Sequence, residues 1–288
     1  MAGKLKMVRD LLGFSGPEYR TGLVLSGGGA RGFAHAGAIK ALKEVGIQPD
    51  IIAGVSAGSV AAVMYSAGIE PEKMVELFHD SRFSDFCEFS MPKGGLFRLD
   101  KFKNFLRKHI PYPNLEDLPV PVVIGATNLD EGTKVIFEKG PLPERVAASC
   151  SIPIVFKPQK IDGVRYVDGG VLHNLPAWSI RNRCKYLIGI NCSPLLKTVV
   201  GNGIVDIAMR SYELMAKTNV IPDMEMCDIV IRNEEIARYK VFNLKEIEKV
   251  FESGYRDTMK FLEENGFKRH AVHGENQKKE EAKQSESK

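Results

Sequence analysis

The chain has 288 residues, of which 44% are hydrophobic and 26% charged, and its formal net charge is +4. This length and composition predict a globular protein with a large core. The longest apolar runs are far shorter than the roughly 20 residues of a membrane span, and the N-terminus lacks the apolar stretch of a secretory signal. No basic block is dense enough to predict nucleic-acid binding, whereas contact with an acidic lipid surface stays open.

Strand-like and helix-like segments alternate from residue 22 onward. This alternation predicts an α/β layered fold with a largely parallel central sheet. The first elements expected are a strand at 22–25, a helix at 32–45, a strand at 51–55 and helices at 57–67 and from 71 to about 80. An irregular apolar segment, 81–99, follows, with five aromatic or methionine side chains set among glycine, serine and proline.

The second half continues the pattern with two hairpins, one of them across Asp162-Gly163, a strong turn signal. We find no Pro/Gly/Ser linker, so we predict one domain over 21–267, an N-terminal extension at 1–20 and a charged, disordered tail at 268–288. The later elements expected are helices at 100–109, 143–148, 205–217 and 244–264, hairpins at 120–128 with 134–138 and 157–161 with 164–167, and strands at 185–190 and 228–231.

The five cysteines are odd in number and lack C-x-x-C spacing, so we expect neither a disulfide framework nor a zinc site. Reduced, mostly buried thiols are typical of a cytoplasmic protein, and this is the location we predict. They are Cys87, Cys150, Cys184, Cys192 and Cys227.

Ser56 stands at the centre of a G-x-S-x-G motif, residues 54–58, between a predicted strand and a predicted helix. In such a turn the glycines allow a sharp reversal that exposes the central hydroxyl, as a nucleophile requires. A small-residue turn is the alternative that the pentapeptide alone leaves open. The surrounding strand and helix favour the nucleophile.

A serine nucleophile needs a base and donors for the oxyanion that forms. Gly27, Gly28 and Gly29 lie between a strand and a helix, where successive N–H groups form an anion-binding cradle. Asp168 ends a predicted strand, and two glycines after it expose its carboxylate, although Asp-Gly-Gly is also an ordinary loop sequence. Asp168 is the leading candidate for the base.

The loop 27–32 also satisfies the G-x-G-x-x-G dinucleotide fingerprint. Asp50, however, precedes the next strand, whereas a ribose-binding acid should end it. No Lys-Ser or Lys-Thr follows the loop, as a P-loop would require. We therefore expect no nucleotide cofactor.

Four ordered motifs carry a family resemblance. They are residues 27–32 (GGGARG) with His35 and Gly37, 54–58 (GVSAG), 151–153 (SIP), and 168–170 (DGG) with Asn174. In this order they resemble the patatin-like phospholipase family, of the bacterial single-domain kind. The resemblance spans roughly 22–190 and implies a three-layer α/β/α sandwich that hydrolyses acyl esters of phospholipids, lysophospholipids or neutral lipids without metal or organic cofactor.

The resemblance also implies a catalytic dyad of Ser56 and Asp168, with the glycine loop as the oxyanion hole. Arg31 is a candidate to bind a substrate phosphate, or equally to pair with a nearby acid. We expect His35 to pack or hydrogen-bond in the helix after the loop. His173 is a weaker alternative base, because it follows Asp168 too closely for the usual triad order.

The sequence thus predicts a serine acyl hydrolase with a lipid or acyl-ester substrate. The alternative is a catalytically silent lipid-binding or regulatory protein on the same fold. The segment 83–97 is either a lid and acyl-chain surface or buried core. The first twenty residues form either a short interfacial helix or a frayed end that packs loosely on the domain, so a peripheral membrane contact is a further hypothesis. The oligomeric state is not readable from the sequence.

Overall fold

The computed structural model describes residues 16–90, 94–194, 197 and 200–269. Residues 1–15 of the predicted N-terminal extension, and residues 270–288 of the predicted disordered tail, lie outside the described residues. A mixed sheet forms the centre, in the order β10-β9-β1-β2-β5-β8-β7, with β6 also paired to β5. Its parallel strands are β1 (Tyr19–Leu25), β2 (Ile51–Val55), β5 (Val122–Asn128), β9 (Cys184–Asn191) and β10 (Ile229–Arg232).

Three further strands join the sheet through antiparallel pairs: β6 and β8 pair with β5, and β7 pairs with β8. The predicted hairpins are confirmed as β5–β6 and β7–β8, and both central residues of the second turn, Asp162 and Gly163, have positive φ. Because β8 pairs antiparallel with β5, its C-terminal Asp168 lies opposite Ala126, within the sheet. The strands are β6 (Thr133–Phe137), β7 (Gln159–Ile161) and β8 (Val164–Asp168).

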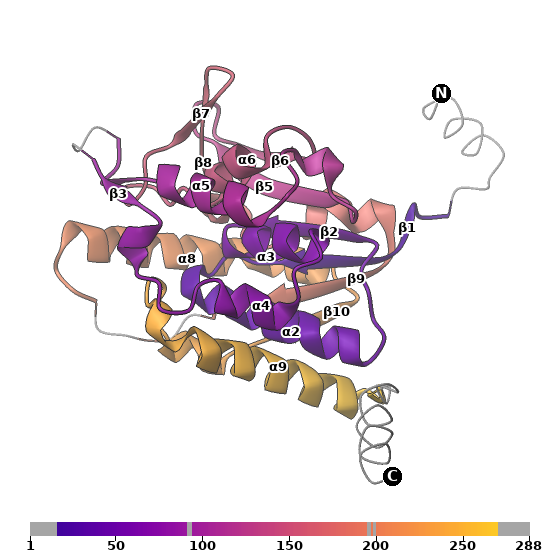
Figure 1. Cartoon of the computed structure of the whole chain (residues 1–288). Coiled ribbons are helices and arrows are strands. Elements are labelled where there is room, and N and C mark those ends of the chain that lie inside the picture. The colour runs from indigo at the N-terminus through magenta and orange to yellow at the C-terminus, as the bar shows by residue number, and fades with distance from the viewer. Residues whose placement is uncertain (1–15, 91–93, 195–196, 198–199, 270–288) are drawn as a thin grey trace, which may run out of the picture.

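Helices cover both faces of the sheet, so the architecture is the expected three-layer sandwich (Figure 1). Side chains alternate along β1: Leu23 and Leu25 join one core, and Val24 joins the other. The larger core lies under α2 (Phe33–Glu44), α3 (Ala57–Ser66), α4 (Pro71–Glu76), α5 (Asp100–His109), α6 (Leu142–Ser149) and α9 (Ile247–Glu264), and the smaller under α7 (Ala177–Ile180) and α8 (Ile204–Glu225).

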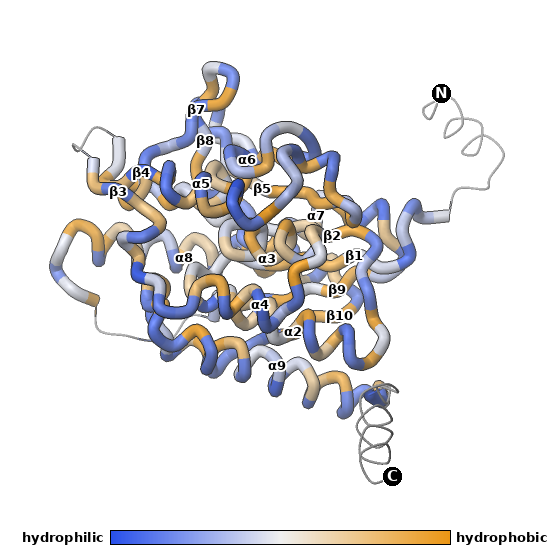
Figure 2. Tube along the Cα trace, in the orientation of Figure 1, coloured by the Kyte–Doolittle hydropathy of each residue, from blue (hydrophilic) through white to orange (hydrophobic). Residues whose placement is uncertain are grey.

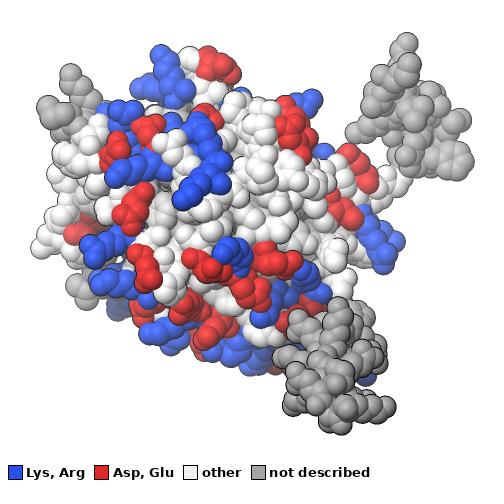
Figure 3. Space-filling view, in the orientation of Figure 1, with Lys and Arg blue, Asp and Glu red and all other residues white. Residues whose placement is uncertain are grey.

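The central strands β2 and β5 are buried along their whole length. Continuous apolar, β-branched runs are typical of strands covered on both faces, and hydrophobic positions mark the middle of the molecule in Figure 2. On the outside, α2 and α9 lie against each other so closely that a Cβ at Gly37 would stand 2.0 Å from the Phe251 carbonyl oxygen. Acidic and basic side chains intermingle over this face (Figure 3).

The segment 81–99 forms a short helical turn and the small hairpin β3 (Glu88–Phe89) and β4 (Phe97–Arg98). Its residues divide between the two predicted roles: Phe83 is packed against the larger core, whereas 71% of Phe89 is exposed. A lid role for this segment remains a prediction. None of the helices in the described part of the chain has the length and hydropathy needed to cross a membrane.

Candidate active site

Ser56 directly follows β2 and precedes α3, with φ of 53°. This left-handed backbone is strained for a residue with a side chain. The turn is tight, because a Cβ at Gly58 would lie 2.3 Å from the Leu25 carbonyl oxygen. The Ser56 N–H donates to Ser149 Oγ at 2.8 Å, and that hydroxyl donates to the Gly125 carbonyl at 2.7 Å. Ser149 therefore braces the strained turn.

Asp168, at the end of β8, is fully buried. Its Oδ1 accepts hydrogen bonds from the Gly170 N–H at 2.8 Å and from the Tyr212 hydroxyl at 2.9 Å. Within the described part of the chain, no hydrogen bond reaches Oδ2. Two donors thus occupy one oxygen and leave the other open for a proton.

Burial raises the pKa of Asp168 to about 6. The hydrogen bonds from Gly170 and Tyr212, together with the nearby Ser56 hydroxyl, lower the pKa and so offset part of this rise. The Ser56 hydroxyl is therefore near enough to stabilise the carboxylate. A base whose pKa lies near neutrality is suited to accept a proton from a serine and return it.

The three glycines of the loop differ in what their N–H groups do. The Gly27 N–H donates to the Asn174 carbonyl at 3.0 Å. The N–H groups of Gly28 and Gly29 have no hydrogen-bond partner among the described residues. Both glycines line a small cleft together with Ser56. The loop thus leaves two adjacent donors beside the nucleophile.

A buried hydrogen-bond network fixes the loop from behind. Ser26 Oγ accepts from the Cys192 N–H at 2.8 Å, and Nε2 of His35 lies 2.8 Å from the Ser26 carbonyl oxygen. Burial lowers the pKa of His35 to about 4, so the ring is neutral and donates this hydrogen bond. The predicted hydrogen-bonding role of His35 is confirmed.

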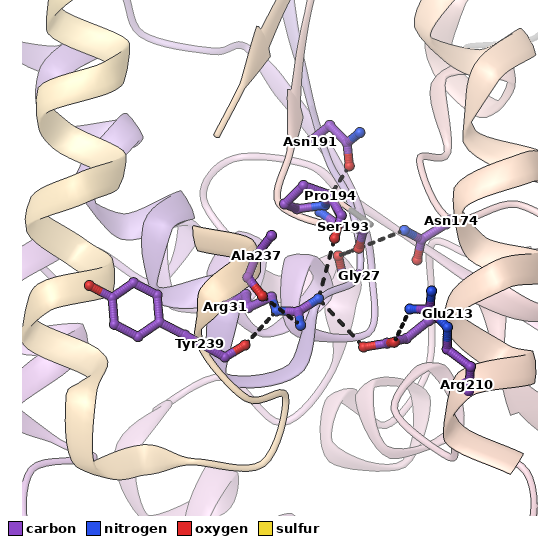
Figure 4. A network of polar contacts seen from close by, with 10 residues as sticks. All are labelled: Gly27, Arg31, Asn174, Asn191, Ser193, Pro194, Arg210, Glu213, Ala237 and Tyr239. Atoms are coloured by element: carbon purple, nitrogen blue, oxygen red, sulfur yellow. Dashed lines mark hydrogen bonds and ion pairs between the residues drawn. The ribbon is translucent and has the colours of Figure 1, made fainter. Parts of the chain in front are cut away.

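Arg31 connects the loop to distant segments (Figure 4). Its guanidinium donates to the carbonyls of Tyr239 at 2.8 Å and Ala237 at 3.3 Å, and it lies 3.5 Å from the Glu213 carboxylate. This ion pair matches one of the two predicted roles. Arg31 also lines the cleft beside Ser56, so substrate contact stays a prediction.

His173 has a different partner from the one that a triad would need. Its Nδ1 lies 2.8 Å from Oδ2 of the buried Asp223, on α8. Asp223 also accepts from the Trp178 N–H at 3.1 Å. Asp223, rather than Asp168, is therefore the acidic partner of His173, and the arrangement does not match a Ser56–His173–Asp168 triad.

Ser56 lines two hollows that differ in size and in lining. One is an apolar cavity of about 180 Å³, and the other is a cleft of about 20 Å³ whose walls combine apolar residues with Arg31, Ser193 and Glu213. Ser56, Gly29, Ile152 and Val241 line both. The remaining cavity walls include Val60, Ala61, Met64, Phe78, Phe83, Phe102, Phe156 and Phe242. An ester carbonyl at Ser56 could therefore place an apolar chain on one side and a polar group on the other.

A family model described as patatin-like phospholipase matches residues 23–180. The chain belongs to the patatin-like phospholipase family. The matched region includes the glycine loop, Ser56 and Asp168, but not Tyr212. Among the described residues, no group of three or more histidine, cysteine, aspartate or glutamate side chains could hold a metal ion.

Curated relatives of this family member come from bacteria and yeast. An uncharacterised NTE family protein of Mycobacterium tuberculosis is 36% identical over 163 residues, which cover 54% of this chain and 44% of that protein. The lysophospholipase NTE1 of Kluyveromyces lactis is 29% identical over 202 residues, covering 65% of this chain and 13% of that protein. The chain thus spans less than half the length of these relatives.

Two solved structures align over most of the chain. VipD from Legionella pneumophila aligns with a TM-score of 0.49 and 15% identity, covering 87% of this chain and 68% of that chain. The type III effector ExoU aligns with a TM-score of 0.43 and 12% identity, covering 89% of this chain and 55% of that chain.

Proposed function

We propose that this protein hydrolyses fatty-acyl esters of phospholipids, lysophospholipids or related lipids. The observation that carries the proposal is the position of Ser56. It lies beside a buried carboxylate with one open oxygen, and it lines both an apolar cavity and a smaller cleft with polar and apolar walls. Membership of the patatin-like phospholipase family and the likeness to a lysophospholipase support the choice of a lipid substrate.

In the first step, the acyl chain occupies the apolar cavity and the head group lies on the side of the cleft. Ser56 Oγ attacks the ester carbonyl while its proton passes to Oδ2 of Asp168. The oxyanion accepts hydrogen bonds from the N–H groups of Gly28 and Gly29. Collapse of this intermediate breaks the ester bond, and the proton from Asp168 leaves with the alcohol. An acyl-enzyme on Ser56 remains.

In the second step, Asp168 takes a proton from water, and the resulting hydroxide attacks the acyl-enzyme. The same two N–H groups stabilise the second oxyanion. Asp168 then returns the proton to Ser56, and the fatty acid leaves. The pKa of about 6 suits both proton transfers, because the carboxylate is ionised at neutral pH and is still basic enough to act.

The test is hydrolysis of p-nitrophenyl butyrate and of a fluorescent lysophospholipid by the full chain. We expect Ser56→Ala and Asp168→Asn to lose activity by at least about a thousandfold. Ser84→Ala and Asp162→Asn are matched controls, because both positions are exposed and neither belongs to a site motif. We expect both controls to keep full activity.

Two other outcomes would redirect the proposal. If Asp168→Asn stays active and His173→Ala does not, the histidine is the base. If the wild type hydrolyses neither ester yet binds a fluorescent fatty acid, the alternative of a catalytically silent lipid-binding protein holds.

A further inference from the structure

Exposed hydrophobic side chains concentrate on one helix. The described residues include twelve large hydrophobic side chains that are exposed, and six of them lie within α8. Ile204 is 79% exposed and Ile207 is 55% exposed. Scattered surface hydrophobics are ordinary, but a set gathered on one helix calls for an explanation. The six are Ile204, Val205, Ile207, Leu214, Met215 and Ile221.

The sequence spacing aligns these residues along the outer side of α8. Ile207, Leu214 and Ile221 follow one another at intervals of seven residues, or about two turns, so they lie in one line. Ile204 and Met215 flank this line. We call these five residues the α8 stripe. The buried residues of the helix, Tyr212, Ala216, Val220 and Asp223, occupy the opposite side.

The helix that carries the stripe also forms part of the candidate active site. Met209, Tyr212, Glu213 and Ala216 of α8 line the cleft at Ser56. In Figure 1, α8 starts at the left of the view, on the side of the molecule where β3 also lies, and Figure 2 shows hydrophobic positions there. The stripe and the cleft thus lie on opposite sides of one helix, so a surface that binds the stripe would be separated from the cleft by the width of α8, about 10 Å.

Two surfaces could cover the stripe: a second copy of the chain or a lipid layer. A helix of 22 residues is about 33 Å long, and a stripe about 10 Å wide on it offers roughly 330 Å². A stable protein interface needs about 800 Å² from each partner. The exposed charged residues of α8 are Asp206, Lys217 and Glu225, which give no block of one sign. Small area and little charge favour a lipid surface.

We propose that the α8 stripe docks the protein on the surface of a lipid bilayer, with its side chains in the region between head groups and acyl chains. The choice of lipid rests in part on the proposed function. Because the exposed charges of α8 are few and of both signs, the docking is driven by apolar contact. Binding to vesicles of neutral phosphatidylcholine should therefore persist when salt is raised, since salt screens charge interactions.

The experiment measures cosedimentation of the full chain with phosphatidylcholine vesicles. The test variant carries Ile207→Asp, Leu214→Asp and Ile221→Asp together. The matched control is Leu129→Asp, because Leu129 is 42% exposed and follows β5, outside α8. We expect the triple variant to partition at least about tenfold less, and the control to partition like the wild type. Leu214→Ser alone should cause a smaller loss of the same kind.

For each variant we also measure the hydrolysis of soluble p-nitrophenyl butyrate and the melting temperature. We expect the triple variant to keep the wild-type rate on p-nitrophenyl butyrate and the wild-type melting temperature, but to hydrolyse vesicle lipid more slowly. Unchanged vesicle binding by a folded triple variant would overturn it. A wild-type dimer that the triple substitution converts to a monomer, without any vesicle binding, would overturn it in favour of a second copy.

The outcomes also separate this proposal from the proposed function. If the wild type binds vesicles through the stripe but hydrolyses no ester, the docking surface stands and the hydrolase proposal fails. If the wild type hydrolyses the soluble ester but binds no vesicles, the hydrolase proposal stands and the docking surface fails.

Discussion

The hydroxyl of Tyr212 donates to Oδ1 of Asp168 at 2.9 Å, from a helix that begins 36 residues after the DGG motif starts. Together with the Gly170 N–H, it holds the carboxylate so that Oδ2 stays open. Tyr212 does not touch the reacting ester in the proposed mechanism. It is therefore a positioning residue for the base.

Removal of this hydroxyl should change both the rate and its pH dependence. Tyr212→Phe keeps the ring, so we expect KM to change little and kcat to fall by about tenfold. The Tyr212 hydrogen bond lowers the pKa of Asp168, so its loss should move the activity midpoint to higher pH. A pH profile of p-nitrophenyl butyrate hydrolysis checks this, with Tyr186→Phe, an exposed tyrosine, as the control. An unshifted midpoint would mean that Tyr212 serves packing alone.

The wild-type profile follows from the pKa of about 6 for Asp168. The base must be ionised to accept the serine proton, so kcat/KM should rise about tenfold per pH unit below 6 and level off above about 7. The measurement is kcat/KM between pH 4.5 and 8.5 on the soluble ester. A profile that is flat across pH 6 would contradict an Asp168 base.

Asp168 should also make the protein less stable at neutral pH. Its folded pKa is about 6 and its ordinary value 3.8, so the folded state holds the proton more tightly and stability falls as pH rises from about 4 to 6. Asp168→Asn should therefore raise stability at pH 7 by about 1 to 3 kcal/mol and make little difference at pH 4. Urea unfolding at both pH values tests this. Equal stabilisation at both would indicate another cause.

The candidate residues at the centre of the site follow from local motifs of the sequence. Ser56, the glycine loop and Asp168 each lie at the end of a strand, where the neighbouring glycines predict a turn. The structure shows which loop N–H groups remain available, because Gly27 is engaged by Asn174, a contact that only the folded chain creates.

Residues brought in from distant elements were missed. Ser149 lies 93 residues from Ser56, and Tyr212 lies 44 residues from Asp168. Neither belongs to a motif, and nothing in a helix sequence marks one serine or tyrosine as a hydrogen-bond partner. The role of 81–99 was left open for a related reason: its phenylalanines look alike in sequence, yet Phe83 lines the cavity and Phe89 is exposed. Helix boundaries also shifted, since α4 ends at Glu76 and α8 continues past Pro222 to Glu225.

Ser149 offers a test of how the strained turn is held. Ser149→Ala removes the acceptor of the Ser56 N–H and leaves that group buried. We expect the free energy of unfolding to fall by about 1 to 3 kcal/mol. We also expect a lower kcat, because Ser56 loses its fixed position. Ser84→Ala provides the control in urea unfolding and in ester hydrolysis. Full activity in Ser149→Ala would show that the turn holds without this brace.

The cavity predicts a dependence on acyl length. Val60 lines the apolar cavity and is not among the residues that line the cleft. Val60→Phe should fill part of the space, so hydrolysis of p-nitrophenyl decanoate should fall at least about tenfold while the acetate ester is hydrolysed as before. An equal loss for both esters would place the acyl chain elsewhere.

The central claim is that Ser56 forms a covalent intermediate with an acyl or phosphonyl group. The most direct measurement is labelling of the full chain with a fluorophosphonate, followed by mass spectrometry of its peptides. We expect one adduct, on Ser56, that is absent in Ser56→Ala and much slower to form in Asp168→Asn. An adduct on another residue, or hydrolysis of esters without any adduct on Ser56, would contradict it.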